Sequence, residues 1–182
     1  MKKIILSSLL LVAGLALTLK AVAADSATVT VTLSDVHLCC GKCVTGATAA
    51  VAPVTGAKAV CDMVGKTVAI TAPDKETAQK AVDALIAAGY FGKSSDSAIK
   101  VSADTGAKDA KVTSVEVTGL HLCCGTCVTA VNGILAKVPG VTGNTAKANA
   151  KSFTVTGDFN DKAMFDEFQK GGLTGKVAAA AK

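Results

Sequence analysis

A duplicated cysteine motif constrains this chain more than any other feature. The segment Val36–Val44, VHLCCGKCV, recurs 84 residues later as Leu120–Val128, LHLCCGTCV. The same offset relates the apolar residues that follow, which are spaced by three, four and three positions, as on one face of an amphipathic helix. These residues are Val44, Ala47, Val51 and Val54 in the first copy, and Val128, Val131, Leu135 and Val138 in the second. The sequence therefore predicts a tandem duplication of one small unit.

Both copies also have the same order of local patterns. In the first copy we expect strands at 28–33, 58–64, 67–71 and 99–101, and helices after the cysteine motif and at 74–88. In the second copy we expect strands at 114–117, 142–148, 152–156 and 176–179, and helices after the motif and at 161–170.

The order strand, helix, strand, strand, helix, strand is that of the split βαβ unit. We therefore predict an α+β fold of two tandem ferredoxin-like βαββαβ domains, at 25–102 and 112–180. Residues 103–111 are rich in small and polar side chains without apolar periodicity, so they are predicted to form an exposed linker.

The first 23 residues are typical of a signal peptide. A short basic start precedes the apolar run 4–19, and Ala21-Val22-Ala23 matches the small-x-small pattern of a cleavage site. A retained membrane anchor is the alternative, but the apolar run is short for a bilayer span. We therefore expect a periplasmic or secreted protein that has no membrane attachment after cleavage.

The charge of the remaining chain argues against a nucleic-acid partner. Without Lys2, Lys3 and Lys20, 16 lysines face 14 acidic residues, and the chain has no arginine and few aromatic residues. A nucleic-acid-binding protein normally has a basic patch with stacking or bidentate side chains. No glycine-rich phosphate loop or Ser/His/Asp set is present, and the chain has only two histidines. We therefore predict no catalytic site.

The duplicated motif places three thiols within five residues, just after a histidine. Six of the seven cysteines lie in these two clusters, which are too short to close the long loops that make a disulfide stabilising. In each cluster a CxxC pair precedes or begins a helix, Cys40 with Cys43 and Cys124 with Cys127. A helix N-terminus lowers the pKa of a thiol, and thiolates select soft ions such as Cu(I). The clusters therefore favour metal binding.

A strand followed by a CxxC loop and a helix, within a βαββαβ unit, resembles the heavy-metal-associated domain. This family includes copper chaperones, the amino-terminal repeats of copper-pumping ATPases and the periplasmic mercury-binding protein. The resemblance implies that Cys40 with Cys43 and Cys124 with Cys127 are the metal ligands. It also implies Cu(I) as the cargo, with Zn(II) or Hg(II) as alternatives, and a metal-transport or acceptor protein as the partner.

The motif departs from the usual family pattern Gly-Met-x-Cys-x-x-Cys. Leucine replaces the methionine and histidine replaces the glycine in both copies, and each copy has one additional cysteine. A third sulfur could make a Cu(I) site three-coordinate, and a Cys₃His set would suit zinc. The additional candidate ligands are Cys39, Cys123, His37 and His121. The seventh cysteine, Cys61, has no counterpart in the second copy and is expected to be a free thiol in a strand.

These observations predict an exported protein that captures, buffers or transfers a soft metal ion, with one ion in each loop. The main alternative is a periplasmic thiol–disulfide redox protein that uses the CxxC pairs. A structural module stapled by disulfides is a third interpretation.

Overall fold

The computed structural model describes residues 28–179, so the predicted signal peptide lies outside the described residues. The first repeat contains β1 (Val29–Ser34), α1 (Gly41–Val51), β2 (Lys58–Asp62), β3 (Thr67–Ala72), α2 (Lys75–Ala87) and β4 (Lys93–Ser94). The second contains β5 (Lys111–Thr118), α3 (Gly125–Leu135), β6 (Val141–Asn144), β7 (Ser152–Asn160), α4 (Asp161–Lys170) and β8 (Lys176–Val177). The structure confirms an α+β fold with two repeated units.

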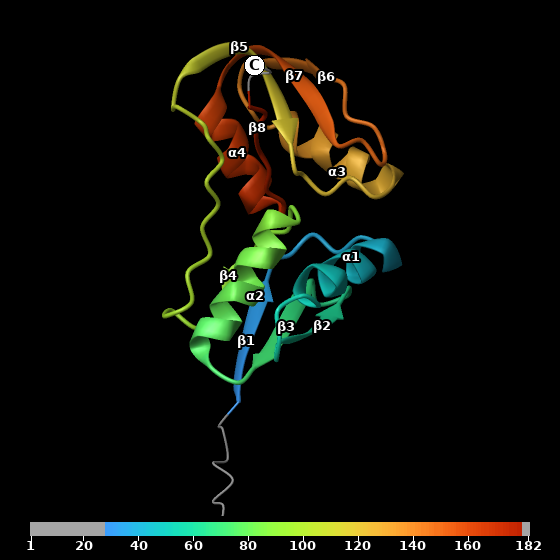
Figure 1. The fold of residues 1–182 in the computed structure, drawn as a ribbon. Coiled ribbons are helices and arrows are strands. Elements are labelled where there is room, and N and C mark those ends of the chain that lie inside the picture. The colour runs from blue at the N-terminus through green and yellow to red at the C-terminus, as the bar shows by residue number, and fades with distance from the viewer. Residues whose placement is uncertain (1–27, 180–182) are drawn as a thin grey trace, which may run out of the picture.

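Each repeat forms its own antiparallel four-stranded sheet. The strand orders are β2-β3-β1-β4 and β6-β7-β5-β8, so corresponding strands occupy corresponding places in the two sheets. With two helices for each sheet, this arrangement is consistent with two ferredoxin-like domains. The two domains lie one above the other, and α1 and α3 face each other across the space between them (Figure 1). None of the helices in residues 28–179 is both long and apolar enough to cross a membrane.

The first residue of α1 that is buried in the core is a cysteine of the motif. Cys43, Ala47 and Val51 are buried at four-residue intervals, which places them on one face of the helix. The predicted face included Val44, but that side chain is only half-buried. The same shift occurs in α3, where Cys127 is buried and Val128 is half-buried. One cysteine of each motif is therefore anchored in the core of its domain.

The last strand of the first domain is not where the sequence pattern placed it. The expected strand at 99–101 is irregular, and β4 instead pairs with Leu33 and Ser34 of β1. The chain leaves α2 through Gly89 at φ +88° and returns to the sheet within a few residues. Ile99 is apolar because it packs in the core, where it is 4 % exposed, and not because it belongs to a strand. In the second domain β8 lies within the expected segment 176–179.

The turn after the second helix of each domain contacts the other domain. The carbonyl of Gly172, after α4, accepts hydrogen bonds from the backbone N–H groups of His37 (3.1 Å) and Phe91 (3.1 Å). In the opposite direction, Thr174 N–H donates to the carbonyl of Gly89 (3.0 Å). Tyr90 and Leu173 form an isolated antiparallel bridge between the two turns. Backbone hydrogen bonds of this kind set the orientation of one domain on the other.

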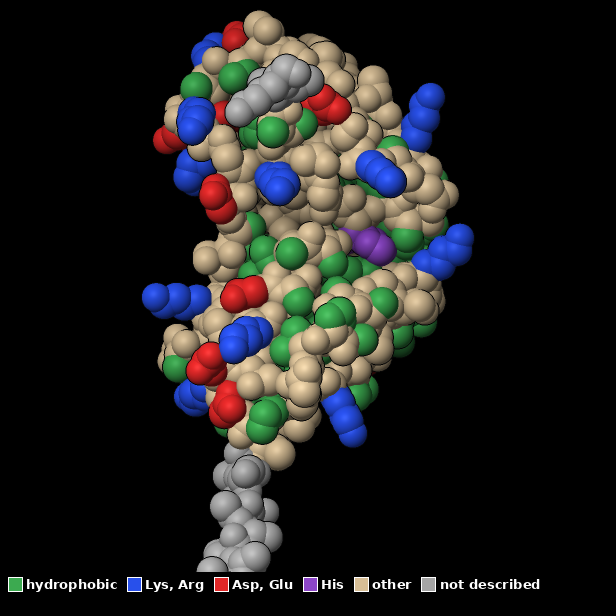
Figure 2. Space-filling view, in the orientation of Figure 1, with side chains coloured by type: hydrophobic (Ala, Val, Ile, Leu, Met, Phe, Trp, Pro, Cys, Tyr) green, Lys and Arg blue, Asp and Glu red, His purple; other side chains and the backbone are tan. Residues whose placement is uncertain are grey.

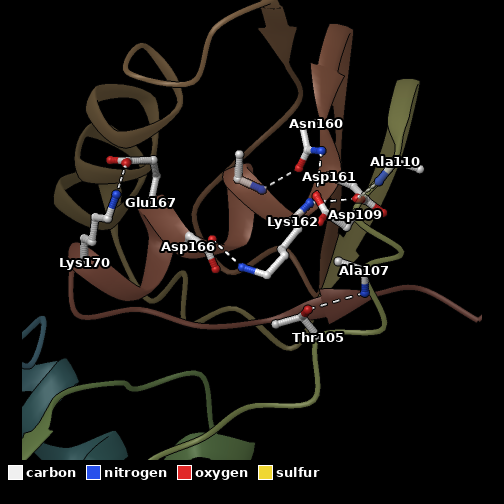
Figure 3. Close-up of polar contacts among 11 residues, drawn as sticks. Thr105, Ala107, Asp109, Ala110, Asn160, Asp161, Lys162, Asp166, Glu167 and Lys170 are labelled. Carbon is white, nitrogen blue, oxygen red and sulfur yellow. Dashed lines mark hydrogen bonds and ion pairs between the residues drawn. The ribbon is translucent and has the colours of Figure 1, made fainter.

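The segment between the domains has little regular structure, but it is fastened to the second domain. The carboxylate of Asp161, the first residue of α4, accepts hydrogen bonds from the N–H groups of Lys108 (2.8 Å) and Ala110 (2.9 Å). Figure 3 shows the second of these bonds. Asn160 Nδ2 donates to Asp109 Oδ1 at 2.9 Å. Asp161 is only 4 % exposed. The end of the linker is therefore held against the start of α4.

Candidate metal centre

The two cysteine motifs have the same local geometry. Cys40 and Cys124 are the N-cap residues of α1 and α3, with extended backbones (φ −162° and −160°). Cys43 and Cys127 lie in the first turn of each helix and are fully buried. The predicted geometry is therefore confirmed: one cysteine of each CxxC pair precedes the helix and the other lies within it.

The two motifs meet between the domains, and their thiols form one cluster. We call the thiols of Cys39, Cys40, Cys43, Cys123, Cys124 and Cys127 the six-thiol cluster. Within one motif, neighbouring sulfurs are 3.5–3.8 Å apart. Between the motifs the distances are equally short, at 3.5–3.9 Å. All six thiols are free.

The sequence led us to expect two separate sites, whereas the structure brings the predicted ligands to one place. Both histidines contribute to it. A ring nitrogen of His121 that could bind a metal lies within 4.8 Å of the sulfurs of Cys43, Cys123 and Cys127. His37 is grouped in the same way with Cys39 and Cys127. Each group contains residues of both domains. Figure 2 shows a histidine side chain at the waist between the domains.

The environment of the cluster favours neutral histidines. Burial lowers the pKa of both His37 and His121, with smaller contributions from the charges of Lys66 and His37 respectively. A neutral imidazole has one nitrogen with a free lone pair, which is the form that binds metals. Both histidines are therefore in the state that ligation requires at neutral pH.

The thiols of the cluster differ in acidity. A hydrogen bond from the backbone N–H of Cys127 is the main reason why the pKa of Cys124 falls to about 6. Burial raises the pKa of Cys39 and of Cys123, and contacts with neighbouring cysteines raise both further. So many sulfurs at such short distances cannot all be thiolates unless cations neutralise them. Metal binding would supply that positive charge and displace the thiol protons.

Tyr90 contributes to the site although it is not one of the predicted metal ligands. Its hydroxyl donates to the carbonyl of Cys43 (2.7 Å) and lies 3.1 Å from His121 Nε2. The side chain is 1 % exposed. Through these two contacts it joins the helix of one domain to the histidine of the other. The signal was Gly46 in the middle of α1, an unfavourable residue in a helix. A Cβ at Gly46 would lie 2.5 Å from the Tyr90 hydroxyl, so glycine leaves the space that this contact needs.

The two histidines consequently have different surroundings. His121 packs against the Tyr90 ring, with ring centroids 4.6 Å apart. The corresponding turn of the second domain offers Leu173, which has no hydroxyl group for His37. Within the described part of the chain, the buried His37 Nε2 has no hydrogen-bond partner. Of the two rings, His37 therefore has the nitrogen that is freer to bind a ligand.

Cys61 belongs to a different environment. It lies on β2, half-buried, and its sulfur is 3.9 Å from Thr48 Oγ1 and 4.0 Å from the carbonyl of Val44. Burial raises the pKa of this thiol. These contacts agree with the predicted free thiol in a strand.

A scan against protein-family models and a search of curated protein sequences gave no match. The solved structures that are similar to this chain include two of CopA from Bacillus subtilis. One is the solution structure of its N-terminal soluble domains, with 13 % identity and a TM-score of 0.32, covering 85 % of this chain and 97 % of that one. The other is the water-soluble region of the P-type ATPase CopA, with 16 % identity and a TM-score of 0.27, covering 82 % of this chain and 91 % of that one.

Proposed function

We propose that this protein is an exported carrier of a soft metal ion, Cu(I), which it captures, buffers or transfers through its two CCxxC loops. The observation that carries the proposal is the six-thiol cluster, in which neighbouring sulfurs of both domains lie 3.5–3.9 Å apart. Thiolates are the ligands that best select Cu(I). Zn(II) and Hg(II) are the alternative cargoes. The predicted signal peptide supports export.

The spacing of the sulfurs fits a shared metal ion. An ion at the centre of a triangle of sulfurs with this spacing lies about 2.0–2.3 Å from each, close to the metal–thiolate distance of about 2.3 Å found for zinc. The cluster is therefore of a size that can enclose a thiophilic ion with little rearrangement.

The cluster is accessible from outside, as transfer to an acceptor protein would require. One pocket beside the first loop is lined by His37, Cys39 and Lys66 among others. A second, beside the other loop, is lined by His121 and Cys123. A thiolate of a partner protein that entered either pocket could bind the ion before the original sulfurs leave. Transfer by ligand exchange follows from such partial exposure.

A thiol–disulfide redox role is the second candidate, and the acidity of Cys124 favours it. A thiol with a pKa of about 6 is largely a thiolate at neutral pH, and Cys127 is 3.8 Å away. The first can serve as nucleophile and the second as resolving thiol. The two candidates differ in what the purified protein contains and in whether it turns over a disulfide substrate.

The test begins with protein purified anaerobically from the compartment to which it is exported. Cu(I) is titrated in the presence of a Cu(I)-selective chelator while free thiols are counted. We expect Cu(I) to be withdrawn from the chelator and six thiols to become protected, both in the wild type and in Cys61→Ser. Replacing Cys43 and Cys127 by serine should abolish this competition. Failure of the wild type to withdraw Cu(I), together with turnover of a disulfide substrate, would overturn metal carriage in favour of the redox role.

A further inference from the structure

The three sulfurs of one motif lie close together. In the first motif, the Cys43 sulfur is 3.5 Å from that of Cys39 and 3.8 Å from that of Cys40. The sulfurs of Cys39 and Cys40 lie within 4.8 Å of each other. In the second motif, the Cys127 sulfur is 3.6 Å from that of Cys123 and 3.8 Å from that of Cys124. Completion of a three-sulfur site within one domain is therefore the arrangement against which any other has to be tested.

Sulfurs of the two domains combined form triangles in which all three sides are 3.5–3.8 Å. Cys39 lies 3.8 Å from Cys124 and 3.5 Å from Cys127, and these two are 3.8 Å apart. The equivalent triangle in the opposite direction joins Cys123 to the CxxC pair of the first domain. The Cys123 sulfur lies 3.8 Å from that of Cys40 and 3.5 Å from that of Cys43, and the last two sulfurs are 3.8 Å apart. The two triangles have the same dimensions and share no sulfur.

We propose that each additional cysteine completes the CxxC site of the other domain. This inference rests on the proposed carriage of a soft metal and specifies its ligands. Cys39 is the third ligand of an ion held by Cys124 and Cys127, and Cys123 is the third ligand of an ion held by Cys40 and Cys43. The centre of either triangle is about 2.1 Å from each sulfur, within the tolerance of about 0.2 Å expected around a thiolate bond of about 2.3 Å.

The domain interface places the additional cysteines for this role. The Gly172 carbonyl binds the N–H of His37, two residues before Cys39. In the other domain, a Cβ at Gly89 would lie 2.5 Å from the backbone nitrogen of His121, two residues before Cys123. Each turn thus packs against the segment that leads into the other domain's additional cysteine. A bound ion would in turn link the two domains, because each site contains sulfurs from both.

Crossed substitutions separate this arrangement from completion within one domain. In full-length Cys124→Ser/Cys127→Ser, one site is lost and the site at Cys40 and Cys43 remains. Adding Cys123→Ser should lower the number of sulfurs bound to Cu(I) from three to two and weaken Cu(I) binding by about tenfold or more. Adding Cys39→Ser to the same background should change neither. X-ray absorption measures the sulfur count, and competition with a Cu(I)-selective chelator measures the affinity.

The reciprocal background provides the matched control. In Cys40→Ser/Cys43→Ser the remaining site lies at Cys124 and Cys127, so here Cys39→Ser should weaken binding and Cys123→Ser should not. Thermal unfolding of each metal-free variant shows whether it still folds. The reverse dependence in the two backgrounds, or two sulfurs per ion in every variant including the wild type, would overturn the crossed sites while leaving metal carriage intact. A wild type that binds no Cu(I) would overturn both proposals.

Discussion

Gly172 tests how the domain interface brings the six-thiol cluster together. Its φ is +78°, and a Cβ there would lie 2.5 Å from the backbone nitrogen of His37. Gly119 has a similar φ of +73°, but a Cβ there meets nothing within 4 Å. Substitution by alanine costs about 1–2 kcal/mol at either position because of the left-handed backbone. Only at Gly172 does it also force the two domains apart.

The additional cost at Gly172 follows from its contacts. Relieving the overlap costs about 1–3 kcal/mol, and the two hydrogen bonds that the Gly172 carbonyl accepts contribute about 1 kcal/mol each. We therefore expect Gly172→Ala to lower the free energy of unfolding by about 3–5 kcal/mol more than Gly119→Ala does, or to open the interface where that is less costly. Gly119→Ala should lower the free energy of unfolding only by the backbone cost of about 1–2 kcal/mol.

The assay combines urea unfolding of the metal-free protein with Cu(I) competition. Gly172→Ala should lose much more stability than Gly119→Ala if the interface stays closed. If the interface opens, the Gly172→Ala variant should instead bind Cu(I) at least about tenfold more weakly than the wild type, because the motifs no longer face each other. Gly119→Ala should bind Cu(I) as the wild type does. Equal stability and equal Cu(I) affinity in the two variants would refute the role of the interface.

Two further substitutions test individual contacts. Tyr90→Phe removes the hydroxyl that joins Cys43 to His121 without changing shape, so unfolding by urea should show a loss of about 1 kcal/mol; an unchanged midpoint would show that the contact contributes nothing. Asp161→Asn should cost about 2 kcal/mol at pH 7, since backbone N–H groups bind the carboxylate. Burial raises the pKa of Asp161, but these bonds outweigh it and the folded pKa lies below the ordinary value. The stabilisation is therefore present above the ordinary carboxyl pKa of about 3.9 and is lost as pH falls through the lowered folded value. The difference between wild type and variant should persist at pH 5 and shrink near pH 2, and a difference independent of pH would contradict this origin.

The sequence alone determined the features that depend on short-range patterns. The repeat revealed two equal units, and alternation and helical spacing located most strands and helices. The sequence also placed Cys40 and Cys124 before a helix and the second cysteine of each CxxC pair in its first turn, because a helix that begins at the motif constrains its neighbours within one turn; the structure then shows Cys40 and Cys124 to be the N-cap residues. The segment 99–101 shows the limit of this reasoning. An apolar residue such as Ile99 indicates burial, but only its neighbours in space decide whether it is in a strand.

Only the tertiary structure decided that the two motifs form one centre. Nothing in either motif indicates that Cys39 lies 3.5 Å from Cys127, a residue 88 positions away. That distance results from contacts between the turns at Gly89 and Gly172 and the opposite loops. Such contacts depend on the shape of two folded surfaces and on backbone groups that every residue has. The glycines at positions 89 and 172 that these contacts require also end helices, so their presence does not reveal the interface. The sequence therefore predicted the candidate ligands but not their partners.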